Sequence, residues 1–269
     1  MGGKNYGWTE TRINRYIKEG RGTGELERYK PWLKVDDVPS EGRQHKEKGW
    51  KTQREHHLMS DLEMKFFYLL EWVDEVVDIY EQYPLDIQAT EQISKQKNIK
   101  HPIDNKTGVL IPFTTDFLIK VLQNGKIKYL ARTVKPSEKL EDSRVLEKLE
   151  IEREYYISKE IDWGIVTEKE LSSNEIVNIS KFHSNYWLHA ELEQYSCLFM
   201  RYFLEAEDGQ NIIGIANDFD ILYDLQVGSA LAIFKHLMAR KKILLKDMSL
   251  LLTFNMYKKE FKINYEDQI

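Results

Sequence analysis

The dipeptide Asn124-Gly125 lies between two runs rich in β-branched and aromatic residues, in the segment FTTDFLIKVLQNGKIKYLARTVKP. Asn and Gly both tolerate the left-handed backbone of a two-residue turn, so this segment predicts a β-hairpin. With these two residues at the centre of the turn, Asp116 faces Thr133 across the strand pair. Lys135 projects from the same face as Thr133, because side chains alternate along a strand. A turn longer or shorter by one residue would separate Asp116 from this face.

Further elements are predicted on both sides of the hairpin. An amphipathic pattern that opens with Ser60 predicts a helix over residues 60–76. The run VVDIYEQYPLDI indicates a strand that ends at Pro84, and a long helix is expected over residues 137–159. The sequence WGIVT at 163–167 indicates another short, buried strand. This order of elements predicts an α/β fold in which helices flank a mixed sheet.

The pattern changes past the last of these strands. Residues 170–182 are interpreted as a connection, and residues 183–269 have a mostly helical pattern. Within that part, GSALAIFKHLMARKKILLKDMSL indicates a helix that runs into a short strand. We therefore expect a first domain over residues 1–170 with a basic N-terminal arm. A smaller, winged-helix-like domain that binds a partner or DNA is expected over residues 171–269.

The formal net charge is −5, but the charges are unevenly distributed. Residues 1–54 hold 13 Lys/Arg and 8 Asp/Glu, and residues 235–262 hold 8 Lys/Arg and 2 Asp/Glu. Two basic segments therefore surround an acidic middle, where a cation site would be electrostatically favoured. The same charge distribution is equally compatible with solvent-exposed surfaces that bind no ligand.

A short basic helix predicted over residues 9–20 and an irregular arm over residues 30–56 carry most of the candidate DNA contacts. The candidates are Arg12, Arg15, Lys18, Arg21 and Arg54. Contacts from such residues to phosphates supply affinity rather than sequence specificity. A second basic cluster comprises Arg240, Lys241 and Lys242, and it suits either DNA or an acidic protein partner.

Three features bear on the compartment. Cys197 is the only cysteine, which excludes a disulfide framework and a zinc site built from cysteines. No apolar run approaches the roughly 20 residues of a membrane-spanning helix. The first residues lack the apolar core of a secretory signal. We expect a cytoplasmic protein that has no membrane contact.

An aspartate on one strand and an x-x-Lys element on the next form the centre of the PD-(D/E)xK nuclease site. Hydrolysis of a phosphodiester requires a hydroxide and the neutralisation of charge on the attacking and departing oxygens. Carboxylate oxygens hold Mg²⁺ for this purpose, and a nearby lysine orients the attacking water or stabilises charge on phosphorus. Asp116 and Lys135 match this pattern. Glu63, on the helix before the sheet, supplies a further carboxylate.

Each of these residues has a structural alternative. Ser60-x-x-Glu63 matches a capping box, in which Glu63 only satisfies a backbone amide at the helix start, and the local pattern favours this role. Asp is depleted in strands and costly to bury without a partner. Asp116 and Lys135 therefore also fit an ion pair that holds no metal.

Other polar residues near these elements favour structural roles. His56 and His57 resemble a metal or base motif, but adjacent residues project in different directions. We therefore interpret them as structural or DNA-facing. Glu81 is interpreted as a solvated residue at a strand end.

Several segments occur in the order that is typical of one known family. They are IKEGRGTG, HHLMSDLEMKFF, EQYPL, IKHP, TTDFL and VKPSEKLEDSRVLEKLEIEREYY. In these segments the chain resembles TnsA, the endonuclease subunit of a heteromeric cut-and-paste transposase. The resemblance runs through residues 12–167 and continues more weakly towards the C-terminus.

The resemblance implies a restriction-endonuclease-like first domain and a winged-helix-like second domain. It implies Mg²⁺-dependent cleavage of the 5′ strands of double-stranded DNA at transposon ends, with Mn²⁺ as a substitute ion. It also implies a separate DDE-type transposase subunit that acts on the 3′ strands. An ATP-dependent regulator subunit would contact the second domain, and the setting would be a bacterial nucleoid.

The family's catalytic positions fall on Glu63, Asp116 and Lys135, and a further acidic position falls on Glu152. One departure concerns the position two before the lysine, which is acidic or Gln in many related nucleases and is Thr133 here. A hydroxyl is a weaker Mg²⁺ ligand than a carboxylate. The implied metal ligands are thus Glu63, Asp116 and either Thr133 or the backbone carbonyl of Val134.

Two other functions remain open. The chain could be an inactive adaptor in which the nuclease fold links transposase, regulator and DNA, and Thr133 favours this alternative. It could also be a stand-alone restriction or repair nuclease, which would cut DNA without a partner.

Overall fold

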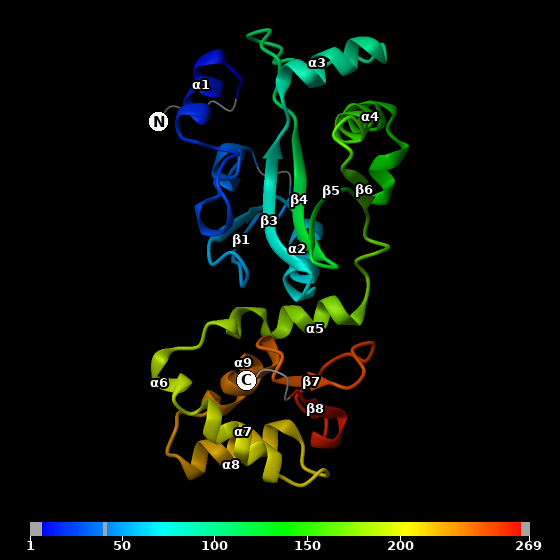
Figure 1. Ribbon diagram of the computed structural model, residues 1–269. Coiled ribbons are helices and arrows are strands. Elements are labelled where there is room, and N and C mark those ends of the chain that lie inside the picture. The colour runs from blue at the N-terminus through cyan, green and yellow to red at the C-terminus, as the bar shows by residue number, and fades with distance from the viewer. Residues whose placement is uncertain (1–6, 40–41, 265–269) are drawn as a thin grey trace. The chain divides into compact units, whose positions relative to one another are not determined.

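The computed structural model describes residues 7–39 and 42–264 (Figure 1). The chain divides into two compact units, one ending at Leu171 and the other beginning at Ser172. Each unit has its own buried apolar core. Within the described ranges, no helix has both the length and the apolar character needed to cross a membrane.

The first unit contains a four-stranded sheet in the order β3-β4-β5-β6. Its strands are β3 (Val76–Pro84), β4 (Thr114–Gln123), β5 (Lys126–Val134) and β6 (Asp162–Val166). The first three are antiparallel neighbours, whereas β6 runs parallel to β5. The sheet is therefore mixed, as the sequence predicted.

The hairpin of β4 and β5 has the predicted two-residue turn. Both residues of the Asn-Gly dipeptide have positive φ, 52° and 73°, a conformation that Asn and Gly adopt more readily than other residues. Phe117 pairs with Arg132 in the ladder. The same register places Asp116 opposite Thr133, which confirms the predicted alignment.

Helix α2 (Asp61–Trp72) covers one face of the sheet. Phe66 of α2 packs edge-on against Phe117 of β4, with 5.4 Å between the ring centroids. The helix begins where it was predicted, because the hydroxyl of Ser60 accepts a hydrogen bond from the amide of Glu63 at its N-terminus.

The opposite face is covered by α3 (Ile87–Gln96) and α4 (Ser143–Ile157), the latter preceded by the 3-10 helix η3 (Ser137–Glu141). Tyr155 and Tyr156 of α4 join the buried cluster of this face, and α3 contributes partly buried apolar side chains. Helices on both faces confirm the predicted α/β class. Helix α3 was not predicted from the sequence.

The N-terminal part is more ordered than the irregular arm that was expected. It contains α1 (Glu10–Lys18), the 3-10 helices η1 (Leu26–Arg28) and η2 (Val35–Asp37), and the antiparallel strands β1 (His45–Lys48) and β2 (Glu55–Leu58). The sequence HKEK of β1 has no alternation of apolar and polar residues. The pattern that usually predicts a strand is therefore missing.

This N-terminal part covers the free edge of β3. The amide of Trp32 donates to the carbonyl of Gln82 over 3.2 Å, and the hydroxyl of Tyr29 donates to the carbonyl of Glu81 over 3.1 Å. An edge strand otherwise leaves a row of backbone groups unpaired. These contacts therefore satisfy backbone carbonyls at the edge of β3 that includes Gln82.

The second unit is mainly helical. Its elements are α5 (Asn174–Phe182), η4 (His183–Tyr186), α6 (Ala190–Glu193), α7 (Ser196–Glu205), α8 (Ile212–Leu222), α9 (Ser229–Ala239), β7 (Ile243–Leu245), η5 (Lys258–Glu260) and β8 (Phe261–Ile263). Helix α9 is central, since Ile233 and Phe234 are fully buried. It leads into the antiparallel pair β7-β8, as its sequence predicted. The segment expected as a connection instead contains α5, whose N-terminus is capped by Ser173.

Candidate functional site

Asp116 and Lys135 meet at the end of the β4-β5 hairpin. Asp116 is 7% exposed, and its Oδ2 accepts hydrogen bonds from the amide of Val134 (2.8 Å) and from Nζ of Lys135 (2.9 Å). The same Nζ donates to the carbonyl of Val134 over 3.1 Å. The ammonium group thus lies between a carboxylate and a backbone carbonyl, and both oxygens suit a cation.

Glu63 both stabilises the start of α2 and belongs to this site. Its carboxylate accepts hydrogen bonds from the amide of Met59 (2.9 Å) and from the hydroxyl of Ser60 (3.2 Å). Burial, and secondly the charge of Asp116, raise the pKa of Glu63 to about 8. The capping role and the site role therefore do not exclude one another.

Lys135 remains charged in this environment. Burial alone would lower its pKa, but the contact with Asp116 and the charges of Glu63 and Glu152 outweigh burial and raise the pKa above its usual value. Lys135 is thus in contact with one carboxylate, that of Asp116, and is influenced by the charges of two more acidic side chains. A second cation at this site would relieve the remaining repulsion.

Glu152 of α4 lies behind the Asp116–Lys135 pair. Its Oε1 accepts hydrogen bonds from the hydroxyls of Thr115 (2.8 Å) and Thr133. Burial is the largest cause that raises the pKa of Glu152 to about 6, and the charge of Asp116 adds to it, against the hydrogen bond from Thr133. The hydroxyl proton of Thr133 is directed at Glu152, which leaves the lone pairs of this oxygen free, and the role of Thr133 as a direct metal ligand stays a prediction.

The donor atoms fit a hard divalent cation. Two carboxylates, those of Glu63 and Asp116, and the carbonyl of Val134 supply oxygen, which Mg²⁺ prefers. In the part of the chain that the structure describes, no cluster of three or more His, Cys, Asp or Glu side chains is arranged to hold a metal. An ion here would therefore complete its shell with water, as Mg²⁺ commonly does.

Two residues of this site were not predicted from the sequence. Gln82 of β3 has Nε2 at 3.5 Å from Oδ1 of Asp116, and Thr115 binds Glu152. Neither belongs to a motif, since isolated Gln and Thr in a strand carry no signal. The pairing of β3 with β4 would have been needed to find them.

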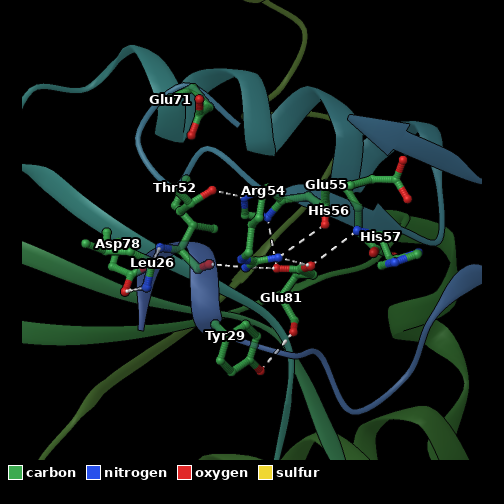
Figure 2. Close-up of polar contacts among 12 residues, drawn as sticks. Leu26, Tyr29, Thr52, Arg54, Glu55, His56, His57, Glu71, Asp78 and Glu81 are labelled. Atoms are coloured by element: carbon green, nitrogen blue, oxygen red, sulfur yellow. Dashed lines mark hydrogen bonds and ion pairs between the residues drawn. The ribbon is translucent and has the colours of Figure 1, made fainter. Parts of the chain in front are cut away.

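A second polar cluster joins β2 to β3 and is centred on Glu81 (Figure 2). Arg54 donates to both carboxylate oxygens of Glu81, and Nδ1 of His56 lies 2.9 Å from Oε2. Burial alone would raise the pKa of Glu81, but His56 and Arg54 outweigh burial and hold it well below its usual range. The interpretation of Glu81 as a solvated residue is wrong, because the residue is fully buried.

The same cluster corrects the role expected for Arg54. Its guanidinium is buried and also donates to the carbonyl of Ile79 over 2.7 Å, so it cannot reach a phosphate in this arrangement. His56 is fully buried between Glu81 and Thr52, with 2.7 Å from Nε2 to the threonine hydroxyl, in agreement with a structural role.

The remaining DNA candidates divide into two groups. Arg21 ion-pairs with Asp37 and Glu19 and is almost covered. Arg12 donates to the hydroxyl of Tyr16 and to backbone carbonyls. Two candidates on α1 remain accessible at the surface, and these are Arg15 and Lys18.

In the second unit, the basic cluster after α9 is partly held by aromatic rings. The guanidinium carbon of Arg240 lies 4.2 Å from the ring centroid of Tyr186. Lys241 is half-buried and Lys242 is exposed. Most of α9 itself is buried, and Leu231, Ala232 and Lys235 are half-buried.

A mixed sheet flanked by helices, with an aspartate and a lysine meeting across neighbouring strands, is the arrangement of the restriction-endonuclease-like fold. Residues 73–168 match the family described as TnsA-like endonuclease N terminal, and residues 170–248 match TnsA endonuclease C terminal. The chain is 40% identical over 265 residues to the Transposon Tn7 transposition protein TnsA of Escherichia coli, covering 98% of this chain and 92% of that protein. The chain belongs to the TnsA endonuclease family.

Proposed function

We propose that this chain is the Mg²⁺-dependent subunit of a heteromeric transposase that cleaves the 5′ strands at transposon ends. The observation that carries the proposal is the convergence of Asp116 Oδ2, Lys135 Nζ and the Val134 carbonyl, with Glu63 beside them. The name of the relative from Escherichia coli ties it to transposition. Its setting would be the bacterial cytoplasm, at the nucleoid.

Glu63, Asp116 and the Val134 carbonyl would hold Mg²⁺, or Mn²⁺ in its place. When bound, the ion acts as a Lewis acid at the phosphate and increases the acidity of its water. Glu63 must lose its proton to act as a ligand, because only the charged carboxylate binds well. With a pKa of about 8 for Glu63, ion binding should therefore strengthen as the pH rises.

Lys135 would act as a charged donor rather than as a base. Its raised pKa keeps the ammonium protonated at neutral pH, so it can orient the attacking water and stabilise negative charge on the phosphate oxygens. Glu152, held by Thr133 and Thr115, would support the site from behind without touching the ion.

The proposed partners act on the same DNA ends. A DDE-type transposase subunit would cut and join the 3′ strands, and an ATP-dependent regulator would bind the second unit. Arg15 and Lys18 of α1 would contact phosphates of the double-stranded DNA.

The first prediction concerns cleavage. Asp116→Ala and Lys135→Ala should each lower 5′-strand cleavage at least about a hundredfold, because charge stabilisation in the transition state is lost. Cleavage is measured with end DNA, the cognate transposase subunit and Mg²⁺. Lys128→Ala is the matched control, since this lysine lies on β5, the strand that leads to Lys135, and its Nζ binds the side chain of Gln123. Normal cleavage by Asp116→Ala would contradict the proposal.

Thr133 favours a second candidate, an inactive adaptor. A hydroxyl stands where many related nucleases have a carboxylate, and it binds Glu152. Failure of the wild-type chain to cut end DNA in Mg²⁺ or Mn²⁺, with its transposase and regulator present, would favour the adaptor. Cleavage without any partner would instead favour a stand-alone nuclease.

A further inference from the structure

Gln82 lies inside β3 with a backbone conformation that strands rarely contain. Its φ is +49°. Among the described residues, it is the only non-glycine residue with positive φ that lies within a β-strand. The residues on either side keep their pairing with β4, since Glu81 pairs with Phe117 and Tyr83 with Thr115. The local backbone is therefore turned at Gln82 without a change in register.

A backbone hydrogen bond from the N-terminal part holds this turned backbone at Gln82. The carbonyl of Gln82 accepts the amide of Trp32 over 3.2 Å. Left-handed backbone in a residue with a long side chain persists only where the surrounding contacts fix it, and such residues cluster at functional sites.

On the other side, the Gln82 side chain reaches Asp116. Nε2 lies 3.5 Å from Oδ1 of Asp116, and Oε1 accepts the hydroxyl of Thr114 over 3.1 Å. A carboxylate accepts hydrogen bonds but cannot donate, so the amide must present its nitrogen to Asp116. The side chain is 3% exposed, and water does not compete freely for this contact.

The hydrogen bonds to Asp116 divide between its two oxygens. Val134 and Lys135 donate to Oδ2, and Gln82 faces Oδ1. Removal of Gln82 would leave Oδ1 without a donor among the described residues, and the carboxylate plane could then rotate about its last torsion. Hydrogen bonds that orient a ligand carboxylate contribute to metal affinity.

We propose that Gln82 is a positioning residue that fixes the carboxylate plane of Asp116 and thereby strengthens divalent cation binding. This inference rests on the proposed function, since it assumes that Asp116 binds the ion.

The variant Gln82→Gly separates the effect of the backbone conformation from the effect of the side chain. Glycine adopts the left-handed conformation without strain, so the variant keeps the turned strand and loses the whole glutamine side chain, including its amide. Gln53→Gly is the matched control, because Gln53 is also a glutamine with positive φ, +59°, and lies in an exposed position outside the site.

Mn²⁺ binding is measured on the full chain by isothermal titration calorimetry, and thermal unfolding is measured without metal. Gln82→Gly should raise the Kd for Mn²⁺ about 10- to 100-fold, the usual effect of losing a partner of a metal ligand. Its Tm should stay close to that of the wild type, because the relieved backbone strain offsets the loss of the buried side chain and of its hydrogen bond from Thr114. Gln53→Gly should bind Mn²⁺ as the wild type does.

A second readout needs no metal. In the metal-free protein, the side-chain amide protons of Gln82 should exchange slowly with solvent in NMR spectra. They should exchange faster in Asp116→Ala, because the oxygen that accepts their hydrogen bond is removed.

The outcomes separate the inference from the proposed function. Wild-type Mn²⁺ affinity in Gln82→Gly, or a loss of affinity accompanied by a lowered Tm, would overturn the positioning role. Weakened binding by Asp116→Ala in the same series would leave the proposed function standing. Wild-type affinity in Asp116→Ala, or no binding by the wild type, would overturn both.

Discussion

Four buried glutamates of the first unit differ in charge state because their neighbours differ. Burial raises the pKa of Glu63 to about 8, of Glu71 to about 7 and of Glu152 to about 6. Glu81 is equally buried, yet contact with His56 and Arg54 keeps its pKa well below its usual range. Cationic partners therefore keep this buried carboxylate charged at neutral pH.

Glu71 makes the stability of the protein depend on pH. Its carboxylate accepts the amide of Trp50 and is 2% exposed. Because its pKa of about 7 in the fold lies above the ordinary 4.5, the folded state binds more protons than the unfolded state between these values. Stability therefore falls as the pH rises through this window, by on the order of 2–3 kcal/mol, and then levels off.

Glu71→Gln should remove this loss, because the amide has no charge to bury. Urea unfolding is measured at pH 5 and pH 8. The free energy of unfolding of the variant, relative to that of the wild type, should be higher at pH 8 than at pH 5. An equal difference between the two proteins at both pH values would contradict the assignment.

The exposed side chains of Arg15 and Lys18 on α1 allow a test of DNA binding. Replacing Arg15 and Lys18 together by Ala should weaken binding and reduce the slope of log K against log salt by about 2, since each phosphate contact contributes roughly 0.9. Lys126→Ala combined with Lys128→Ala removes the same charge from the β4-β5 hairpin. Equal slopes for the two double variants would count against a specific role of α1.

Among the secondary-structure elements, β2 and β3 are joined by contacts to Glu81, which include a buried ion pair with Arg54, the residue just before β2. Arg54→Met would leave the Glu81 carboxylate buried without its main partner, which should cost about 3–5 kcal/mol of unfolding free energy. Arg132→Met breaks an ion pair with Asp162 that is largely open to solvent and should cost about 1 kcal/mol or less.

Chemical denaturation of both arginine variants, followed by circular dichroism, measures this difference. Similar losses for the two variants would show that the buried pair adds nothing beyond an exposed one.

Elements with a strong local signal were predicted, and those stabilised by other elements were missed. The Asn-Gly turn specifies the β4-β5 register by its own backbone preference, and Ser60 specifies the start of α2. Strand β1 has the sequence HKEK and exists because β2 pairs with it. Its formation depends on pairing with the next strand, which the residues of β1 themselves do not indicate.

At the scale of the whole molecule, the division after Leu171 suggests two independently folding units. Separate chains covering residues 1–171 and 172–269 should each unfold cooperatively. The first should bind Mn²⁺ with the affinity of the full chain, because Glu63, Asp116 and Lys135 all lie within it. A first fragment that stays unfolded, or that loses Mn²⁺ binding while folded, would contradict this prediction.

The sequence alone determined the hairpin register and hence the meeting of Asp116 with Lys135, because a two-residue turn and strand alternation are local properties. Family resemblance added Glu63 and Glu152. Three features became visible only in the folded chain: Arg54 is an interior ion-pair partner, Thr133 is directed at Glu152, and Gln82 lies beside Asp116. Each of these depends on how β2, α4 or β3 packs against another element, and burial and charge at such contacts arise from residues far apart in the chain.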